Sequence, residues 1–119
     1  MTAMEVRTVA EFNRLIQSGV ALVDFYAPWC APCRAQEPVI EALSDAYARQ
    51  ATIGKVDVER IRETARTCGV MSIPTLILFC NGCEVDRFIG LQRRETLTRS
   101  IDAALLLSAD NRPSKGKRP

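Results

Sequence analysis

The most constraining feature of the sequence is a pair of cysteines, Cys30 and Cys33, placed just after an apolar run from Val20 to Ala27. A nearly continuous apolar run of this length is typical of a strand covered on both faces. If the next segment is helical, the two side chains lie on one face of the helix, about 5 to 6 Å apart, which suits a disulfide. The sequence therefore predicts a strand and a helix joined at a dithiol that opens and closes without moving the fold.

The surroundings of this pair favour redox chemistry over metal binding. Cys30 is expected at or just before the helix N-terminus, where unpaired amides and the helix dipole stabilise a thiolate. Pro32 suits the first helical turn and stiffens the loop between the sulfurs. A zinc site would need two more Cys or His ligands, but the chain has no histidine, and its other close pair, Cys80 and Cys83, is expected too far away. A C-x-x-C beside a β-α-β pattern indicates thiol–disulfide exchange, and we expect no metal site.

Length and composition indicate a single domain that handles thiols inside the cell. The chain has 119 residues, of which 47% are hydrophobic, enough to bury an ordinary core without disulfides. Residues 1–19 lack the apolar core of a signal peptide, and no apolar run approaches the roughly 20 residues that span a bilayer. We therefore expect a cytoplasmic protein with no membrane anchor, in which five cysteines indicate thiol chemistry rather than structural disulfides.

Charge is distributed unevenly along the chain. The net charge of +2 comprises +3 on residues 110–119 and −1 on residues 1–109. Residues 1–109 carry no basic patch, so we expect no nucleic-acid partner. The charges, prolines and glycine of residues 110–119 predict a disordered basic tail, either merely solvated or weakly attracted to an acidic partner. The folded domain is accordingly assigned to residues 1–109.

Hydrophobic periodicity and turn signals predict the order of the elements. A capping box at Thr8 starts a helix that ends at Gly19, and Pro38 predicts a kink in the next helix. Asn81-Gly82 indicates a two-residue hairpin. The expected strands after the first helix are 20–27, 52–58, 75–80 and 84–89, and the expected helices are 8–19, 31–50, 59–67 and 93–107. The order βαβαβαββα predicts an α/β fold, a central mixed five-stranded sheet flanked by about four helices.

Three segments resemble the thioredoxin family at the family's spacing, and the resemblance covers about residues 5–107. They are Val23–Cys33 with the active-site motif, Lys55–Asp57 in a strand, and Ser72–Thr75 in the cis-proline loop. Ala31 replaces the family's usual glycine, and Tyr26 stands where many members have a second tryptophan. Because neither change alters the thiols, the resemblance implies a thioredoxin fold with its chemistry intact.

The resemblance implies a protein disulfide reductase, a thiol-disulfide oxidoreductase that passes electrons from a thioredoxin reductase to protein disulfides. Cys30, expected to face the solvent, would attack the substrate, and the more shielded Cys33 would resolve the mixed disulfide. Asp24 lies in an apolar strand, where burial raises the pKa of a carboxyl, and would accept and donate the proton, with Lys55 as counter-ion. The alternative for Asp24 is a buried polar contact without a catalytic role. Pro32 would tune the redox potential.

The resemblance also implies a docking surface for an extended protein segment. The sequence alone favours a trans bond before Pro74, whereas the resemblance implies a cis bond that exposes backbone groups for pairing. An apolar rim around Cys30 would suit unfolded or flexible protein substrates. Its expected members are Trp29, Ala31, Ile73, Pro74, Ile89, Gly90 and Leu91.

Cofactor and partner expectations come from the family as well. We expect no bound cofactor, because the redox-active disulfide of Cys30 and Cys33 is the carrier and NADPH acts indirectly through the reductase. The expected partners are that reductase and disulfide-containing client proteins, and the protein is expected to be a monomer. One alternative is a disulfide isomerase or oxidase, although such relatives usually carry histidine where this chain has Ala31-Pro32. Another is a redox-independent binding module that uses the same surface.

Three further cysteines have no part in this scheme. Cys80 and Cys83 flank the hairpin turn, where cross-strand pairing brings α-carbons to about 5.5 Å, but no helix terminus activates either thiol. We interpret them as incidental thiols, with a second redox site as the alternative. Cys68 is interpreted as an inert, partly buried thiol, with a regulatory or dimer-forming thiol as the alternative.

Overall fold

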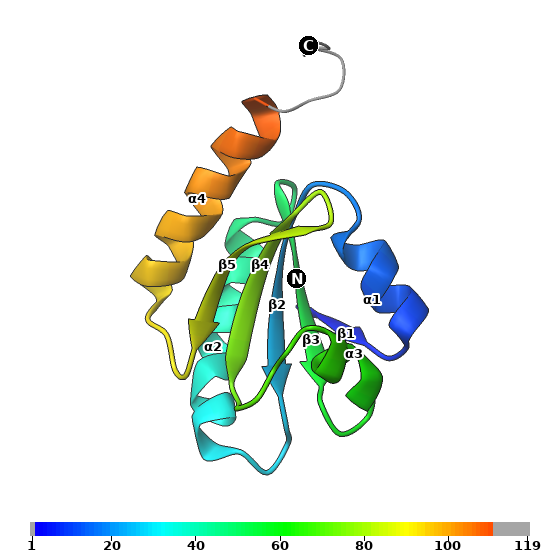
Figure 1. Ribbon diagram of the computed structural model, residues 1–119. Helices are drawn as coiled ribbons and strands as arrows, with labels where there is room; N and C mark the ends of the chain where they lie inside the picture. Colours follow the sequence, from blue (N-terminus) through cyan, green and yellow to red (C-terminus); the bar gives the residue numbers. More distant parts are fainter. Residues whose placement is uncertain (1, 111–119) are drawn as a thin grey trace.

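The computed structural model describes residues 2–110, which form one sheet with helices on both faces (Figure 1). The strands are β1 Met4–Val6, β2 Val20–Tyr26, β3 Ala51–Asp57, β4 Thr75–Cys80 and β5 Cys83–Ile89. The helices are α1 Val9–Ile16, α2 Ala31–Ala46, α3 Arg62–Thr67 and α4 Arg94–Asp110. Their order is the predicted one. The predicted tail, residues 110–119, lies outside the described residues except for Asp110, with which α4 ends.

Strand β2, which leads to the two cysteines, occupies the centre of the sheet. The strand order is β1-β3-β2-β4-β5. β2 pairs parallel with β3 and antiparallel with β4, and β5 pairs antiparallel with β4 at the edge. The last strands run antiparallel because Asn81 and Gly82 both have positive φ, 52° and 87°, as a type I′ hairpin turn requires. The mixed five-stranded sheet and its hairpin are thus confirmed.

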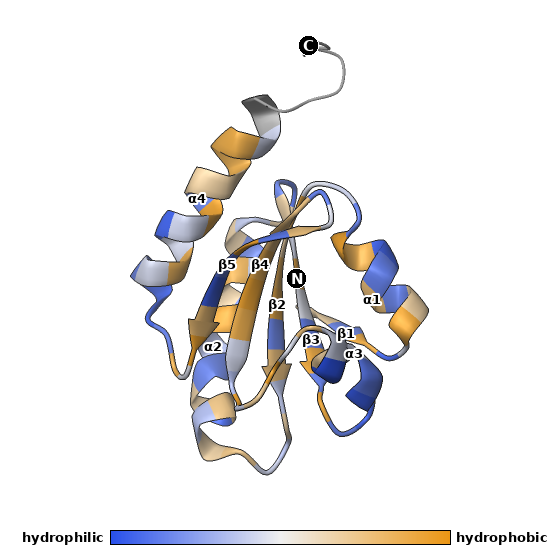
Figure 2. Ribbon diagram, in the orientation of Figure 1, coloured by the Kyte–Doolittle hydropathy of each residue, from blue (hydrophilic) through white to orange (hydrophobic). Residues whose placement is uncertain are grey.

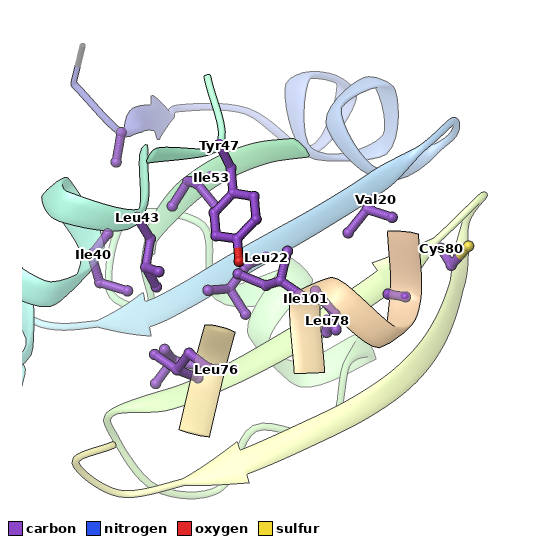
Figure 3. Packing of buried hydrophobic residues seen from close by; sticks show 13 residues of the cluster. Val20, Leu22, Ile40, Leu43, Tyr47, Ile53, Leu76, Leu78, Cys80 and Ile101 are labelled. Carbon is purple, nitrogen blue, oxygen red and sulfur yellow. The ribbon is translucent and has the colours of Figure 1, made fainter. Parts of the chain in front are cut away.

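The two faces of the sheet carry separate apolar cores. Helices α2 and α4 cover the first, where Leu22 and Leu78 of the sheet pack with Ile40 and Ile101 (Figure 3). Helices α1 and α3 cover the second core. Strand β4 contributes side chains to both cores, and Figure 2 shows that it is almost wholly apolar. Because side chains alternate along a strand, Asp24 lies on the same face as Leu22. The one carboxylate of β2 therefore points toward α2, the helix that carries the cysteines.

Four helix ends differ by three or more residues from the predicted ones, and at two of them local turns explain the difference. α1 ends at Ile16, three residues before the predicted Gly19. α2 continues through Pro38 as one helix but ends four residues before the predicted Gln50, where hydrogen bonds to the carbonyl oxygen of Tyr47 turn the chain into β3. α3 begins three residues after the predicted Glu59, because the side chain of Asp57 accepts the N–H of that residue and holds it in a turn. α4 runs three residues past its predicted end. None of the helices in residues 2–110 is long and apolar enough to cross a membrane.

Candidate active site

The loop between β2 and α2 presents the two cysteines at a helix N-terminus. Cys30 is the N-cap residue of α2, with φ −84° and ψ 116°, and the N–H of Cys33 donates to its sulfur at 3.3 Å. Pro32 lies in the first turn, where its missing N–H leaves no helical bond unmade. An amide aimed at the sulfur, at the positive end of a helix, stabilises negative charge on Cys30. Both cysteines are free thiols in this structure.

Both thiols are buried, so the expectation that Cys30 faces the solvent is wrong. Cys30 is 5% exposed and Cys33 is 4% exposed. Tyr26, Val58 and Ile73, which come from three other segments, pack against them. The Cys30 thiol lies 4.0 Å from the carbonyl oxygen of Ile73. The two cysteines therefore differ in their polar neighbours rather than in their depth.

The thiol of Cys33 holds its proton strongly. The pKa of Cys33 is raised to about 12, mainly by burial and then by the hydrogen bond and charge of Cys30 and the charge of Asp24, while a hydrogen bond with the backbone at Ala27 acts in the opposite direction. At neutral pH Cys33 is therefore protonated. A reaction that uses it as a nucleophile needs a base nearby.

Asp24 is a buried carboxyl in the middle of β2. It is 1% exposed, and within residues 2–110 its Oδ1 atom has no hydrogen-bond partner. Burial raises the pKa of Asp24 from 3.8 to about 7, the charge of Lys55 lowers it, and the charges of Glu37 and Glu5 raise it. A carboxyl with a pKa near 7 exchanges a proton readily at neutral pH.

A cavity of about 270 Å³ connects Asp24 with Cys33. The volume is sufficient for several water molecules, and the carboxyl and thiol in its wall can hydrogen-bond to them. The structure therefore brings the predicted base and the predicted resolving thiol to one space. The other lining residues are Tyr26, Ala27, Pro28, Arg34, Glu37 and Lys55.

Lys55 forms its ion pair with Glu37 rather than with Asp24. Its Nζ atom lies 2.6 Å from Oε2 of Glu37 and 4.9 Å from the centroid of the Tyr26 ring. The β2–β3 register places Lys55 opposite Asp24, so its charge acts on that carboxyl across the cavity. Glu37 was not predicted from the sequence, although it lies four residues after Cys33 and hence on the same face of α2.

The predicted docking residues surround the cysteines on neighbouring loops. The bond between Ile73 and Pro74 is cis, as the resemblance implies, and the carbonyl oxygen of Pro74 accepts the N–H of Gly90 at 2.8 Å. Trp29 is 65% exposed, and its indole N–H donates to Glu59 at 2.8 Å. Of the other members, Pro74 is buried, Ile73 and Gly90 are half-buried, and the exposed ones are Ala31, Ile89 and Leu91.

Two glutamines that were not predicted from the sequence fix the loop after β5. The amide of Gln36, fully buried on α2, accepts the N–H of Gln92 at 2.7 Å and donates to its carbonyl oxygen at 3.0 Å. The amide of Gln92 donates in turn to the carbonyl oxygens of Ile89 and Gly90. A polar residue three positions after Cys33, on the inward face of the helix, was the available signal. The helix that carries Cys33 thus holds part of the apolar rim.

Comparison with known proteins agrees with this fold. The thioredoxin family model matches residues 3–103. A thioredoxin of Staphylococcus aureus is 46% identical over 98 residues, which are 82% of this chain and 94% of that protein. A mutant thioredoxin of Halobacterium salinarum has a similar structure, with a TM-score of 0.81, 35% identity, and coverage of 87% of this chain and 91% of that one. The thioredoxin of Plasmodium falciparum superposes with a TM-score of 0.77 at 31% identity, covering 85% of this chain and 98% of that one. This chain belongs to the thioredoxin family of thiol-disulfide oxidoreductases.

Proposed function

We propose that this protein disulfide reductase passes electrons to client disulfides through Cys30 and Cys33, with Cys30 as the nucleophile and Cys33 as the resolving thiol. The observation that carries the assignment is the N-cap geometry, in which the N–H of Cys33 donates to the sulfur of Cys30 at 3.3 Å. That amide stabilises a thiolate on Cys30 only. Cys33, whose pKa burial raises to about 12, stays protonated until the second step.

The first step is attack by the Cys30 thiolate on one sulfur of the client disulfide. The client S–S bond breaks, a mixed disulfide forms at Cys30, and the first client thiolate leaves and takes up a proton. In the second step the Cys33 thiolate attacks the sulfur of Cys30. The second client thiol leaves, and the bond between Cys30 and Cys33 closes. Two electrons have then passed from the protein to the client.

Asp24 supplies the base for the second step. Its carboxylate accepts the proton of Cys33 through the cavity that both residues line, and it returns the proton to the departing client thiolate. A pKa of about 7 supports both transfers, because the carboxyl gains and loses a proton at neutral pH. Lys55, held by Glu37, limits how far burial can raise that pKa.

The client segment binds beside the cis-proline loop. We propose that an extended segment pairs with the backbone before Pro74 and rests on exposed apolar side chains, which include Trp29, Ile89 and Leu91. An apolar rim favours unfolded or flexible proteins over charged small disulfides. Within this scheme a thioredoxin reductase that uses NADPH restores the dithiol, and the reaction takes place in the cytoplasm.

The test is reduction of insulin disulfides, coupled to NADPH oxidation through a thioredoxin reductase. The parent protein should turn over, Cys30→Ser should abolish turnover, and Cys33→Ser should accumulate a mixed disulfide with insulin. Cys68→Ser is the matched control, because it removes a thiol outside the site, and it should turn over like the parent. Full turnover by the Cys30→Ser protein would overturn the assignment.

The role of Asp24 has its own test. Asp24→Asn removes the group with a pKa of about 7, so the pH dependence of turnover near neutrality should disappear along with most of the rate. A pH profile identical to that of the parent would remove Asp24 from the mechanism. It would leave the assignments of Cys30 and Cys33 untouched.

A further inference from the structure

A second pair of cysteines, which the proposed mechanism does not use, lies on the two strands of the hairpin, one on each side of the turn. β4 ends at Cys80, β5 begins at Cys83, and the two residues are direct register partners. The two residues between them, Asn81 and Gly82, form the type I′ turn. Directly opposite residues of antiparallel strands point to the same face of the sheet. The two thiols therefore share one face at one end of the sheet.

The spacing of such a pair matches the needs of a disulfide. Opposite α-carbons in antiparallel strands lie about 4.5 to 5.5 Å apart, within the range of about 4.4 to 6.8 Å that disulfides span. A bond between Cys80 and Cys83 then requires side-chain rotation and no change of register. Neither thiol lies at a helix terminus that would activate it, and for this reason the sequence alone favours incidental thiols. In the structure their closeness to each other takes the place of that activation.

The backbone of the turn is held in the geometry that keeps the two cysteines opposite. The side-chain oxygen of Asn81 accepts the N–H of Gly19 at 2.7 Å, and the N–H of Asn81 donates to the carbonyl oxygen of Gly19 at 2.9 Å. This reciprocal pair ties the hairpin to the loop before β2. The turn is thereby fixed from outside the hairpin, so an encounter between the thiols costs little conformational entropy.

The two thiols differ in accessibility in the way that stepwise oxidation requires. Cys83 is exposed, whereas Cys80 is 7% exposed and lies at the end of the core beneath α4 (Figure 3). A small disulfide can reach Cys83 directly. Cys80 is sheltered from the small disulfide, but it lies beside the adduct that this disulfide would leave on Cys83. Cys68 packs with the core on the opposite face of the sheet, so it is not placed to compete.

We propose that Cys80 and Cys83 form a second redox couple, oxidised by a low-molecular-weight disulfide such as glutathione disulfide. The thiolate of Cys83 attacks glutathione disulfide, whose S–S bond breaks, so that one glutathione leaves as its thiol and the other stays bound to Cys83. The thiolate of Cys80 then attacks the sulfur of Cys83 and releases the second glutathione. Two protein thiols lose two electrons and two protons, and one glutathione disulfide becomes two glutathione thiols.

This couple works separately from the first one. Pro74 and Cys80 are joined by a strand, whose six steps span roughly 20 Å at about 3.3 Å per residue. Electrons therefore do not pass directly between the turn and Cys30 within one molecule. Oxidation of the turn records the state of the glutathione pool without consuming the catalytic dithiol.

The experiment uses the full chain with Cys30→Ser and Cys33→Ser, which leaves three thiols. The protein is incubated in buffers of increasing glutathione disulfide, quenched with an alkylating agent and mapped by peptide mass spectrometry. We expect a monomer that loses two of three alkylation sites, with a peptide linkage between Cys80 and Cys83. Three free thiols at all ratios, a bridge to Cys68, or only intermolecular bonds would each overturn the proposal.

Single replacements separate the two steps. In the same background, Cys80→Ser should stop at a glutathione adduct on Cys83, whereas Cys83→Ser should remain largely unmodified because Cys80 is buried. If the background variant does not fold, the parent protein is mapped in the same way, and the linkage must appear beside the one between Cys30 and Cys33. Glutathione adducts on Cys83 that persist with Cys80 present would also contradict the proposal.

Discussion

Replacement of Asp24 by asparagine should stabilise the folded protein at neutral and alkaline pH. Asp24 is 1% exposed, and burial is the main cause that raises its pKa from 3.8 to about 7. Between these two pH values the folded protein keeps a proton that the unfolded chain has released. The free energy of unfolding therefore falls as pH rises from about 4 to about 7, and the loss is complete above the folded-state pKa.

The size of the effect follows from the two pKa values. At about 1.36 kcal/mol for each pKa unit, ionisation of Asp24 lowers the free energy of unfolding by roughly 4 kcal/mol at pH 8. Asparagine has a similar shape and cannot ionise. Asp24→Asn should thus be more stable than the parent by roughly 4 kcal/mol at pH 8, and by less than about 1 kcal/mol at pH 4.

Urea unfolding from pH 4 to pH 9 measures this difference. Trp29, the only tryptophan, reports the transition by fluorescence, and excess reductant keeps all thiols reduced. Glu63→Gln is the matched control, since it removes an exposed carboxylate of α3 and should leave the pH dependence of the parent unchanged. If Asp24→Asn and the parent differ by the same free energy of unfolding at pH 4 and pH 8, burial does not raise the pKa of Asp24. The reason for assigning Asp24 as the base would then be removed.

Three further predictions test the surroundings of the site. Glu37→Gln removes a charge that raises the pKa of Asp24 and leaves Lys55 free to lower it, so the free energy of unfolding of the variant should fall at a lower pH than that of the parent. The same pH dependence in both proteins would contradict the pairing of Lys55 with Glu37. Gln36→Leu frees the loop after β5, which should raise KM for insulin several-fold and leave reduction of a small aromatic disulfide unchanged; equal effects on both substrates would deny a docking role. Gly82→Ala forces an L-residue to a φ of 87°, which should lower the free energy of unfolding by about 1 to 2 kcal/mol in urea, and no loss would rule out the type I′ turn.

Local sequence patterns predicted the fold because each main element has its own signal. The apolar run of β2, the capping residue Thr8 and the Asn81-Gly82 turn act over a few residues, and the structure has all three as expected. Helix ends were predicted less well. The early end of α2 and the late start of α3 depend on hydrogen bonds to Tyr47 and Asp57 that periodicity does not describe.

The site was predictable only where its residues are close in sequence or match the family. Cys30, Cys33 and Asp24 lie within ten positions, and the structure gathers them at one helix end and one cavity. The pairs that surround them join distant positions, such as Lys55 with Glu37, and a single sequence does not reveal such pairing. The burial of Cys30 was missed for the same reason, since the segments that cover it come from elsewhere in the chain.

The most direct test of the central claim is to follow bond formation between Cys30 and Cys33 in the full chain across glutathione buffers. Peptide mass spectrometry with Cys80 and Cys83 replaced by serine removes the second couple from the measurement. We predict an intramolecular bond that forms at equilibrium and is reversed by a thioredoxin reductase with NADPH. Glutathione adducts on Cys30 that persist without closure to Cys33 would contradict the account.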